Sequence, residues 1–181
     1  MKLNYKSVLT AATLMIACAN ANANMVWDIY AGGTAGLGGM ALSSDKADRT
    51  NWSAQSYGAV FGIALPVVSF EAEYDYLKSD EMNMHMVMGN AYVKFLGAAV
   101  VNPYIGVGVG MMLDAETDYD VDIDPTIAYQ GMLGMTFNIP AIPFKVDLEG
   151  RALLMPDLFK IAGDDVSALH YDARLKLRYI F

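Results

Sequence analysis

The 181-residue sequence has a single cysteine, Cys18. An intrachain disulfide framework and a zinc site built from paired cysteines are therefore excluded. Basic residues are also few, with 12 Lys and Arg against 20 Asp and Glu and a formal net charge of −8. This deficit argues against nucleic acid as a partner, because such binding relies on a positive surface. The length fits one domain.

A long hydrophobic run is absent as well. Fifty-five per cent of the residues are apolar and only 18% are charged, which is too hydrophobic for a disordered chain and for a usual soluble domain. After the N-terminal segment, however, glycine, asparagine or a charged residue interrupts each apolar stretch before it reaches the roughly 18 to 20 residues of a transmembrane helix. The apolar residues must therefore serve another kind of structure.

The first 23 residues have the pattern of a secretory signal peptide. Two lysines precede an apolar stretch over residues 8–18, and alternating alanine and asparagine follow. These small residues predict cleavage after Ala21 or Ala23. In the alternative, the four residues that end at Cys18 resemble a lipoprotein box, and the lipidated cysteine becomes the new N-terminus. Either processing removes or caps the thiol, so the mature domain, residues 24–181, has no reactive cysteine.

The mature chain alternates between apolar and polar residues with a period of two, which belongs to strands and not to helices. The alternation predicts eight strands, near 26–42, 55–65, 69–78, 84–97, 103–114, 126–138, 144–155 and 168–181. Short connections at 66–68, 97–102 and 139–143 alternate with long polar ones at 43–54, 78–83, 115–125 and 156–167. This arrangement predicts an all-β fold, an eight-stranded antiparallel up-and-down transmembrane β-barrel.

The aromatic residues test this prediction independently, because they gather at both ends of the predicted strands. At the short-turn ends lie Trp27, Phe70, Phe95, Phe137, Phe144 and Phe181, and toward the long-loop ends lie Tyr57, Tyr76, Tyr129 and Tyr171. Two aromatic girdles are typical of the two interfaces of a bilayer. The alternative is a soluble β-sandwich or lipocalin-like barrel with inward apolar faces, and the small number of charges counts against it.

The polar parity of the strands defines a predicted lumen. It contains seven acids and six bases: Asp28, Glu71, Glu73, Asp75, Asp147, Glu149 and Asp172 with Lys94, Lys145, Arg151, Arg174, Lys176 and Arg178. Eight strands leave an interior just wide enough for side chains. We therefore predict a packed, salt-bridged lumen that is almost neutral and does not form a channel.

Four stretches, at residues 89–95, 103–110, 128–134 and 177–181, resemble in order and spacing a known family. It comprises the small eight-stranded outer-membrane barrels, which include the OmpA-like domains, the opacity proteins and the bacterial surface antigens. The resemblance implies a surface antigen, adhesin or structural protein in contact with outer-membrane lipid. It also implies that Leu177, Tyr179 and Phe181 form the signal that the barrel-assembly machinery recognises.

Some barrels of this size modify lipid A, and a deacylase of that kind needs His and Ser together on the lipid-facing side. Ser167 and His170 are three residues apart and therefore point to opposite faces of a strand. We interpret His170 as a lumen residue and His85 as a rim or loop residue without a hydroxyl neighbour. No GxSxG, HExxH or phosphate-binding loop occurs. We expect neither enzymatic activity nor a cofactor.

An acidic loop is the first of two candidate metal sites. Asp118, Asp120, Asp122 and Asp124 alternate there, and carboxylates suit a hard cation such as Ca²⁺. In an extended strand these acids, from Asp114 onward, would continue the lumen parity of the preceding strand. The EF-hand pattern fails because Ile123 and Tyr129 stand where glycine and glutamate are required. We favour a solvated acidic loop that discourages edge pairing.

The methionines at every second position of 82–88 are the other candidate, because thioethers bind soft metals. We favour packing near the rim as their role, so no metal site is predicted.

The sequence therefore predicts an exported, non-enzymatic outer-membrane barrel whose loops contact an extracellular ligand. Trp52 in the first loop and the acidic third loop are the candidate contact surfaces. A narrow ion pore and a lipid A-modifying enzyme are the alternatives.

Overall fold

The structure, a computed structural model, describes residues 27–44, 47–79, 82–95, 100–117, 126–139, 141–161 and 164–181. The predicted signal peptide and the acids Asp118, Asp120, Asp122 and Asp124 lie outside the described residues. The strands are β1 (Asp28–Ser44), β2 (Ala47–Ala64), β3 (Val68–Ser79), β4 (Met82–Lys94), β5 (Val101–Thr117), β6 (Ile127–Asn138), β7 (Phe144–Ile161) and β8 (Asp164–Ile180). Within these residues, no helix is long and apolar enough to cross a membrane.

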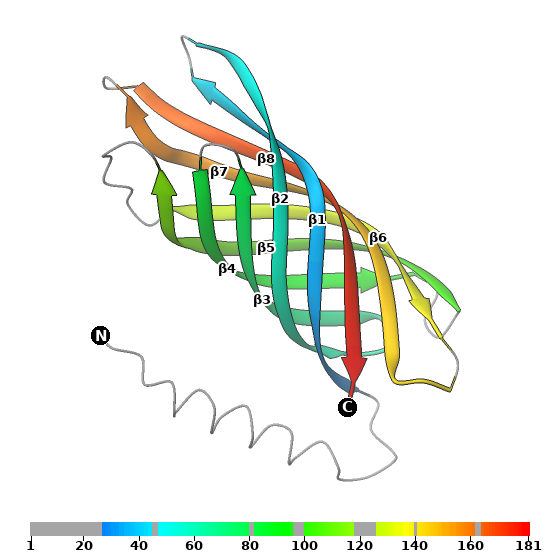
Figure 1. Ribbon diagram of the computed structural model, residues 1–181. Helices are drawn as coiled ribbons and strands as arrows, with labels where there is room; N and C mark the ends of the chain where they lie inside the picture. The colour runs from blue at the N-terminus through cyan, green and yellow to red at the C-terminus, as the bar shows by residue number, and fades with distance from the viewer. Residues whose placement is uncertain are drawn as a thin grey trace.

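The eight strands form one closed barrel in sequence order (Figure 1). Each strand pairs antiparallel with the next, and β8 closes the barrel on β1 through a register that begins at Tyr30 and Ile180. The start of β1 and the end of β8 lie at one end of the barrel, together with the β2–β3, β4–β5 and β6–β7 connections, and we call this the turn end. The opposite end is the loop end. The predicted fold class is confirmed.

Side chains alternate between the interior and the outer surface, as the pleat of a strand requires. In β3 the acids Glu71, Glu73 and Asp75 are buried, whereas Phe70 and Tyr74 are exposed. A soluble barrel would show the opposite distribution. On this strand the inner face is therefore charged, and the outer face is apolar.

The predicted long loops at 43–54 and 156–167 are wrong. β1 and β2 pair as far as Ser44 and Ala47, and β7 and β8 pair as far as Ile161 and Asp164. These hairpins extend beyond the others at the loop end (Figure 1). Backbone pairing does not need an apolar face, so the strands continue where the apolar alternation stops. The predicted loop at 78–83 is shorter for the same reason, because only residues 80–81 separate β3 from β4.

A β-bulge in β5 corrects the predicted lumen parity of Asp114. Met86 pairs with Met112, but the preceding residue, His85, pairs with Asp114, so that Leu113 is the extra residue. An extra residue reverses the side-chain parity beyond it. Met112 is consequently buried and Asp114 is exposed.

Candidate functional site

The turn-side and middle parts of the barrel interior contain a network of buried ion pairs. Its members, which we call the ionic network, are Glu71, Glu73, Asp75, Asp147, Glu149, Arg151, Asp172, Arg174, Lys176 and Arg178, and all ten are buried. They lie on β3, β7 and β8. The described residues thus place six acids and four bases in the interior.

Three predicted lumen residues lie instead near the turn-end rim. Asp28 is exposed, and its carboxylate is 3.5 Å from the ammonium group of Lys145. Lys94, the last residue of β4, is half-buried and donates to the carbonyl oxygen of Leu65 at 3.4 Å. Because two of these three residues are bases, the interior is more acidic than the predicted lumen.

Several ion pairs cross the barrel from β3 to the strands opposite. Arg151 on β7 contacts Asp75, and Arg174 on β8 contacts Glu73. Lys176 lies 2.7 Å from Glu71. Since β3 is not adjacent to β7 or β8 in the sheet, these contacts connect opposite walls of the barrel.

Other pairs join neighbouring strands with two-point geometry. Arg151 donates from Nε and Nη2 to the two carboxylate oxygens of Asp172, at 3.0 and 2.7 Å. Arg178 donates from Nε and Nη2 to Asp147, both at 2.6 Å. Such paired, charge-assisted bonds are strong and directional. They hold β7 against β8 from the inside.

Neutral donors satisfy further carboxylate oxygens of Glu71, Glu73 and Glu149, whereas Oδ1 of Asp75 has no hydrogen-bond partner among the described residues. The hydroxyls of Tyr30 and Tyr92 donate to Glu71 at 3.0 and 2.8 Å, and that of Tyr104 donates to Glu149 at 2.8 Å. The Asn90 amide donates to Glu73 at 2.7 Å. Buried charges need such partners to be tolerated.

Glycines on the inner face of β5 make room for these side chains. A Cβ atom at Gly106 would lie 2.5 Å from Cδ1 of Tyr92, and one at Gly108 would collide with Asn90 and Gln130. A cavity between Tyr30, Tyr92 and Tyr104 measures about 10 Å³, which is room for about one water molecule. The ionic network is therefore closely packed there.

The loop-side interior has a different chemistry. Seven buried methionines, which we call the methionine cluster, pack there with leucine and alanine: Met40, Met82, Met84, Met86, Met88, Met112 and Met155. Sequence reasoning placed four of these near the rim but did not extend the lumen parity to them. Their alternation was the available signal, because each follows the inward parity of β4.

The described outer surface is apolar over the central part of the strands. Leu37, Val107 and Leu133 are each at least two-thirds exposed. Among the residues whose burial the structure describes, the exposed charged side chains are Asp28, Lys78 and Asp114, which lie near strand ends. An apolar band with charge confined to its edges is typical of a surface that faces lipid.

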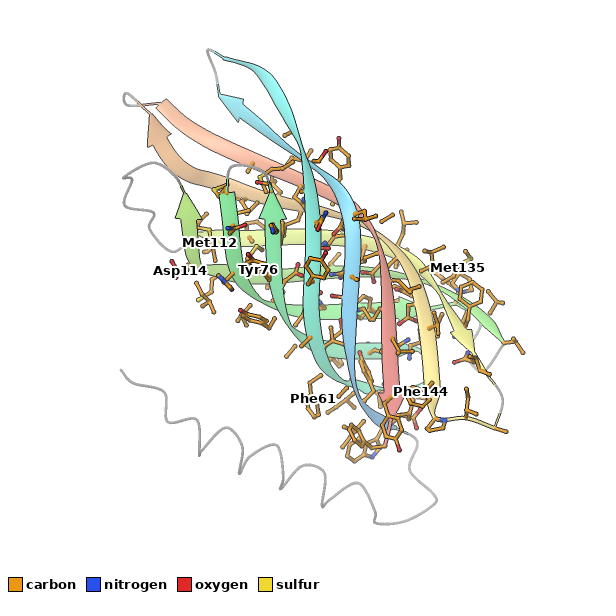
Figure 2. The ribbon with its side chains drawn as sticks, viewed as in Figure 1. Phe61, Tyr76, Met112, Asp114, Met135 and Phe144 are labelled. Atoms are coloured by element: carbon orange, nitrogen blue, oxygen red, sulfur yellow. The ribbon has the colours of Figure 1, made fainter. Side chains whose placement is uncertain are left out.

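The predicted girdle residues lie on this outer surface. Trp27, Phe70, Phe95, Phe137 and Phe144 are exposed toward the turn end, and Tyr57, Tyr129 and Tyr171 are exposed on the loop side. Tyr76 is half-buried against the ring of His85, at a centroid distance of 4.8 Å. Figure 2 shows Phe144 near the C-terminal end of the barrel and Tyr76 toward the other end. The C-terminal Leu177, Tyr179 and Phe181 are also exposed.

The position and neighbours of His85 differ from those expected from the sequence. It lies within β4 on the outer face, and the hydroxyl of Tyr74 is 2.6 Å from its Nδ1. The expectation that His85 has no hydroxyl neighbour is therefore wrong. The two residues are distant in sequence, and the register of β3 against β4 brings them together.

A shallow apolar groove of about 590 Å³ lies on the outer face over β2 to β5. Small residues, Ala72, Gly89 and Ala91, line it beside Phe61 and Val107. Figure 2 shows Phe61 on this outer surface. The groove has the apolar lining that a hydrocarbon chain requires.

Comparison with solved structures identifies the class to which this architecture belongs, the small eight-stranded outer-membrane barrel fold. Neisserial surface protein A is 14% identical, with a TM-score of 0.59 over 84% of this chain and 97% of that one. The N-terminal β-barrel domain of Pseudomonas aeruginosa OprF is 11% identical, with a TM-score of 0.55 over 82% and 97%. No protein-family model and no curated protein sequence matches the chain.

Proposed function

We propose that the chain is a non-enzymatic integral protein of the bacterial outer membrane, with a packed interior and a loop end that faces the medium. The main support for this proposal is the distribution of side chains, which is the reverse of that in a soluble barrel. Buried ion pairs inside and a continuous apolar surface outside are stable only where lipid surrounds the barrel. The fold shared with two outer-membrane proteins supports the same location.

The orientation follows from the two ends of the barrel. In outer-membrane barrels the segments that extend furthest beyond the membrane face outward, and the end with the short turns faces the periplasm. The turn end contains the start of β1 and the end of β8. The loop end, with the long β1–β2 and β7–β8 hairpins, would then carry contacts with an extracellular ligand, as in an antigen or adhesin.

Epitope insertion tests the orientation with a matched pair of sites. One tag is inserted between Ser44 and Ala47, and the control tag is inserted after Ala141 in the β6–β7 connection. We expect antibody to label intact cells that carry the first tag, and to label the second only after the outer membrane is permeabilised. Labelling of the second tag alone on intact cells would reverse the orientation.

The absence of enzymatic activity is also part of the proposal. The hydroxyl that contacts outward-facing His85 belongs to a tyrosine, whereas acyl-transfer triads use serine or a related nucleophile. Inward-facing His170 lies beside Asp172. Lipid A from cells that express the protein should have an unchanged mass spectrum. A mass change abolished by His85→Ala would show that the outer face is catalytic.

We also propose that the apolar groove receives acyl chains of outer-membrane lipid and that the exposed Leu177, Tyr179 and Phe181 guide assembly. Deletion of Phe181 should reduce the amount of folded barrel in cells, yet leave refolding into detergent unchanged. Equal losses in both settings would mean that Phe181 acts on stability and not on recognition.

A further inference from the structure

The methionine cluster contributes seven of the twelve residues in the loop-side core. Its members come from β1, β4, β5 and β7, so their side chains pack together from several sides of a narrow interior. Packing alone does not require sulfur at so many positions, because leucine fills similar volume with better-defined rotamers. A thioether does, however, provide a soft, neutral donor atom.

A buried histidine lies at the boundary between the methionine cluster and the ionic network. His170 is fully buried, and its Nε2 is 3.2 Å from Oδ2 of Asp172. Neither ring nitrogen makes a hydrogen bond among the described residues, so Nε2 has only this close approach to the carboxylate and Nδ1 has no polar contact that the described residues supply. The residues paired with His170 on the flanking strands are Met40 and Leu153, and both belong to the loop-side core. A buried imidazole nitrogen without a partner is free to act as a ligand.

The charges nearby favour a cation. The ionic network contains six acids and four bases, and Asp172 joins it to His170 through the contact with Nε2. A carboxylate on one ring nitrogen orients the imidazole so that the other nitrogen binds metal, an arrangement common in metal sites. A monovalent cation beside His170 would also offset part of the acidic excess.

We propose that the methionine cluster and Nδ1 of His170 bind one soft monovalent metal ion, Cu(I) in the first place and Ag(I) as its chemical analogue. Thioether and neutral imidazole donors favour such ions, whereas Mg²⁺ and Ca²⁺ require oxygen ligands. The ion binds and leaves as Cu(I), so no electron transfer is involved. The loop-side position would place this site in the half of the barrel nearest the medium.

The test uses the full mature chain folded in detergent with Cu(I) under anaerobic conditions and then freed of unbound metal. Variants are His170→Gln, Met40→Leu and one in which all seven cluster methionines become leucine. The control carries Met111→Leu and Met135→Leu, which are outer-face positions, and Met111 is the immediate neighbour of buried Met112. Gel mobility reports folding of each variant. A Cu(I) chelator in competition measures affinity, and X-ray absorption at the copper edge identifies the ligands.

We expect one Cu(I) per wild-type barrel with sulfur and nitrogen ligands, and the same for the outer-face control. His170→Gln and Met40→Leu should each weaken binding by about tenfold or more, and the seven-leucine variant should retain no copper. If the seven-leucine variant does not fold, the two single variants decide the question. The proposal is wrong if the folded wild type retains no copper, or if the outer-face control loses as much as Met40→Leu.

Discussion

Arg174 on β8 contacts Glu73 on β3 across the interior of the barrel, and both side chains are fully buried. The same guanidinium donates through Nε to Glu149 on β7 at 2.5 Å. One side chain therefore connects three strands, of which β3 lies on the far side of the barrel wall. The pair acts as an internal brace at the centre of the ionic network.

Replacing Arg174 should accordingly be costly. Arg174→Met removes the cation that contacts both Glu73 and Glu149, and breaking a buried pair in this way typically costs about 3–5 kcal/mol. Urea unfolding in lipid vesicles, followed by gel mobility, measures the loss. Lys78→Met, at an exposed position of β3, is the control and should change stability by about 0.5 kcal/mol or less. Equal effects of the two substitutions would contradict the brace.

Alanine substitutions at two glycines compare the packing of the barrel interior with that of the outer surface. Gly106→Ala places a methyl group against the buried ring of Tyr92, which should cost about 1–3 kcal/mol. A methyl group at Gly131 would meet no described atom of another strand within 4 Å, so that Gly131→Ala should be neutral. The same unfolding measurement compares them. A loosely packed lumen would tolerate both substitutions equally.

A charged substitution on the outer surface should destabilise the barrel more at the middle of the membrane than at its edge. Leu133→Arg, at an exposed position in the middle of β6, should cost about 2–4 kcal/mol in a bilayer. Val67→Arg, in the β2–β3 connection, should cost about 0–1 kcal/mol. Both variants are compared by reversible unfolding in vesicles. If Leu133→Arg unfolds at the wild-type urea concentration, the band does not face lipid.

The packed interior predicts a barrel that does not conduct. The cross-barrel pairs of the ionic network and the methionine cluster fill the described lumen from the turn side to the loop side. Single-channel recording in planar bilayers should therefore show no steady conductance steps. Steps that change with Glu73→Gln would support the pore alternative instead.

The period of two was sufficient to predict eight strands, their antiparallel order and the inward direction of residues such as Glu73 and Arg174. The direction of a side chain depends only on the local geometry of its strand, so the alternation of residue types in the sequence is enough to predict it. Strand ends were predicted less well, because parity marks where the apolar band ends, whereas pairing between Leu42 and Thr50 continues beyond it. Side-chain patterns contain little information on that continuation.

Features that depend on register were outside the reach of sequence reasoning. The bulge that turns Asp114 outward involves the pairing of β4 with β5, and the contact between Tyr74 and His85 involves the pairing of β3 with β4. Met40, Met112 and Met155 pack in one cluster with the β4 methionines only because the strands close into a barrel. Such non-local relationships appear only when neighbouring strands are aligned.

Gel mobility of the protein from the outer-membrane fraction, with and without boiling, tests the central claim most directly. A membrane barrel held by closed strand pairing and buried ion pairs stays folded in detergent at room temperature and unfolds on heating. We predict that the unboiled protein migrates faster than the boiled protein and resists extraction with salt. Identical migration of both samples, from a fraction that salt washes off the membrane, would contradict a lipid-embedded barrel.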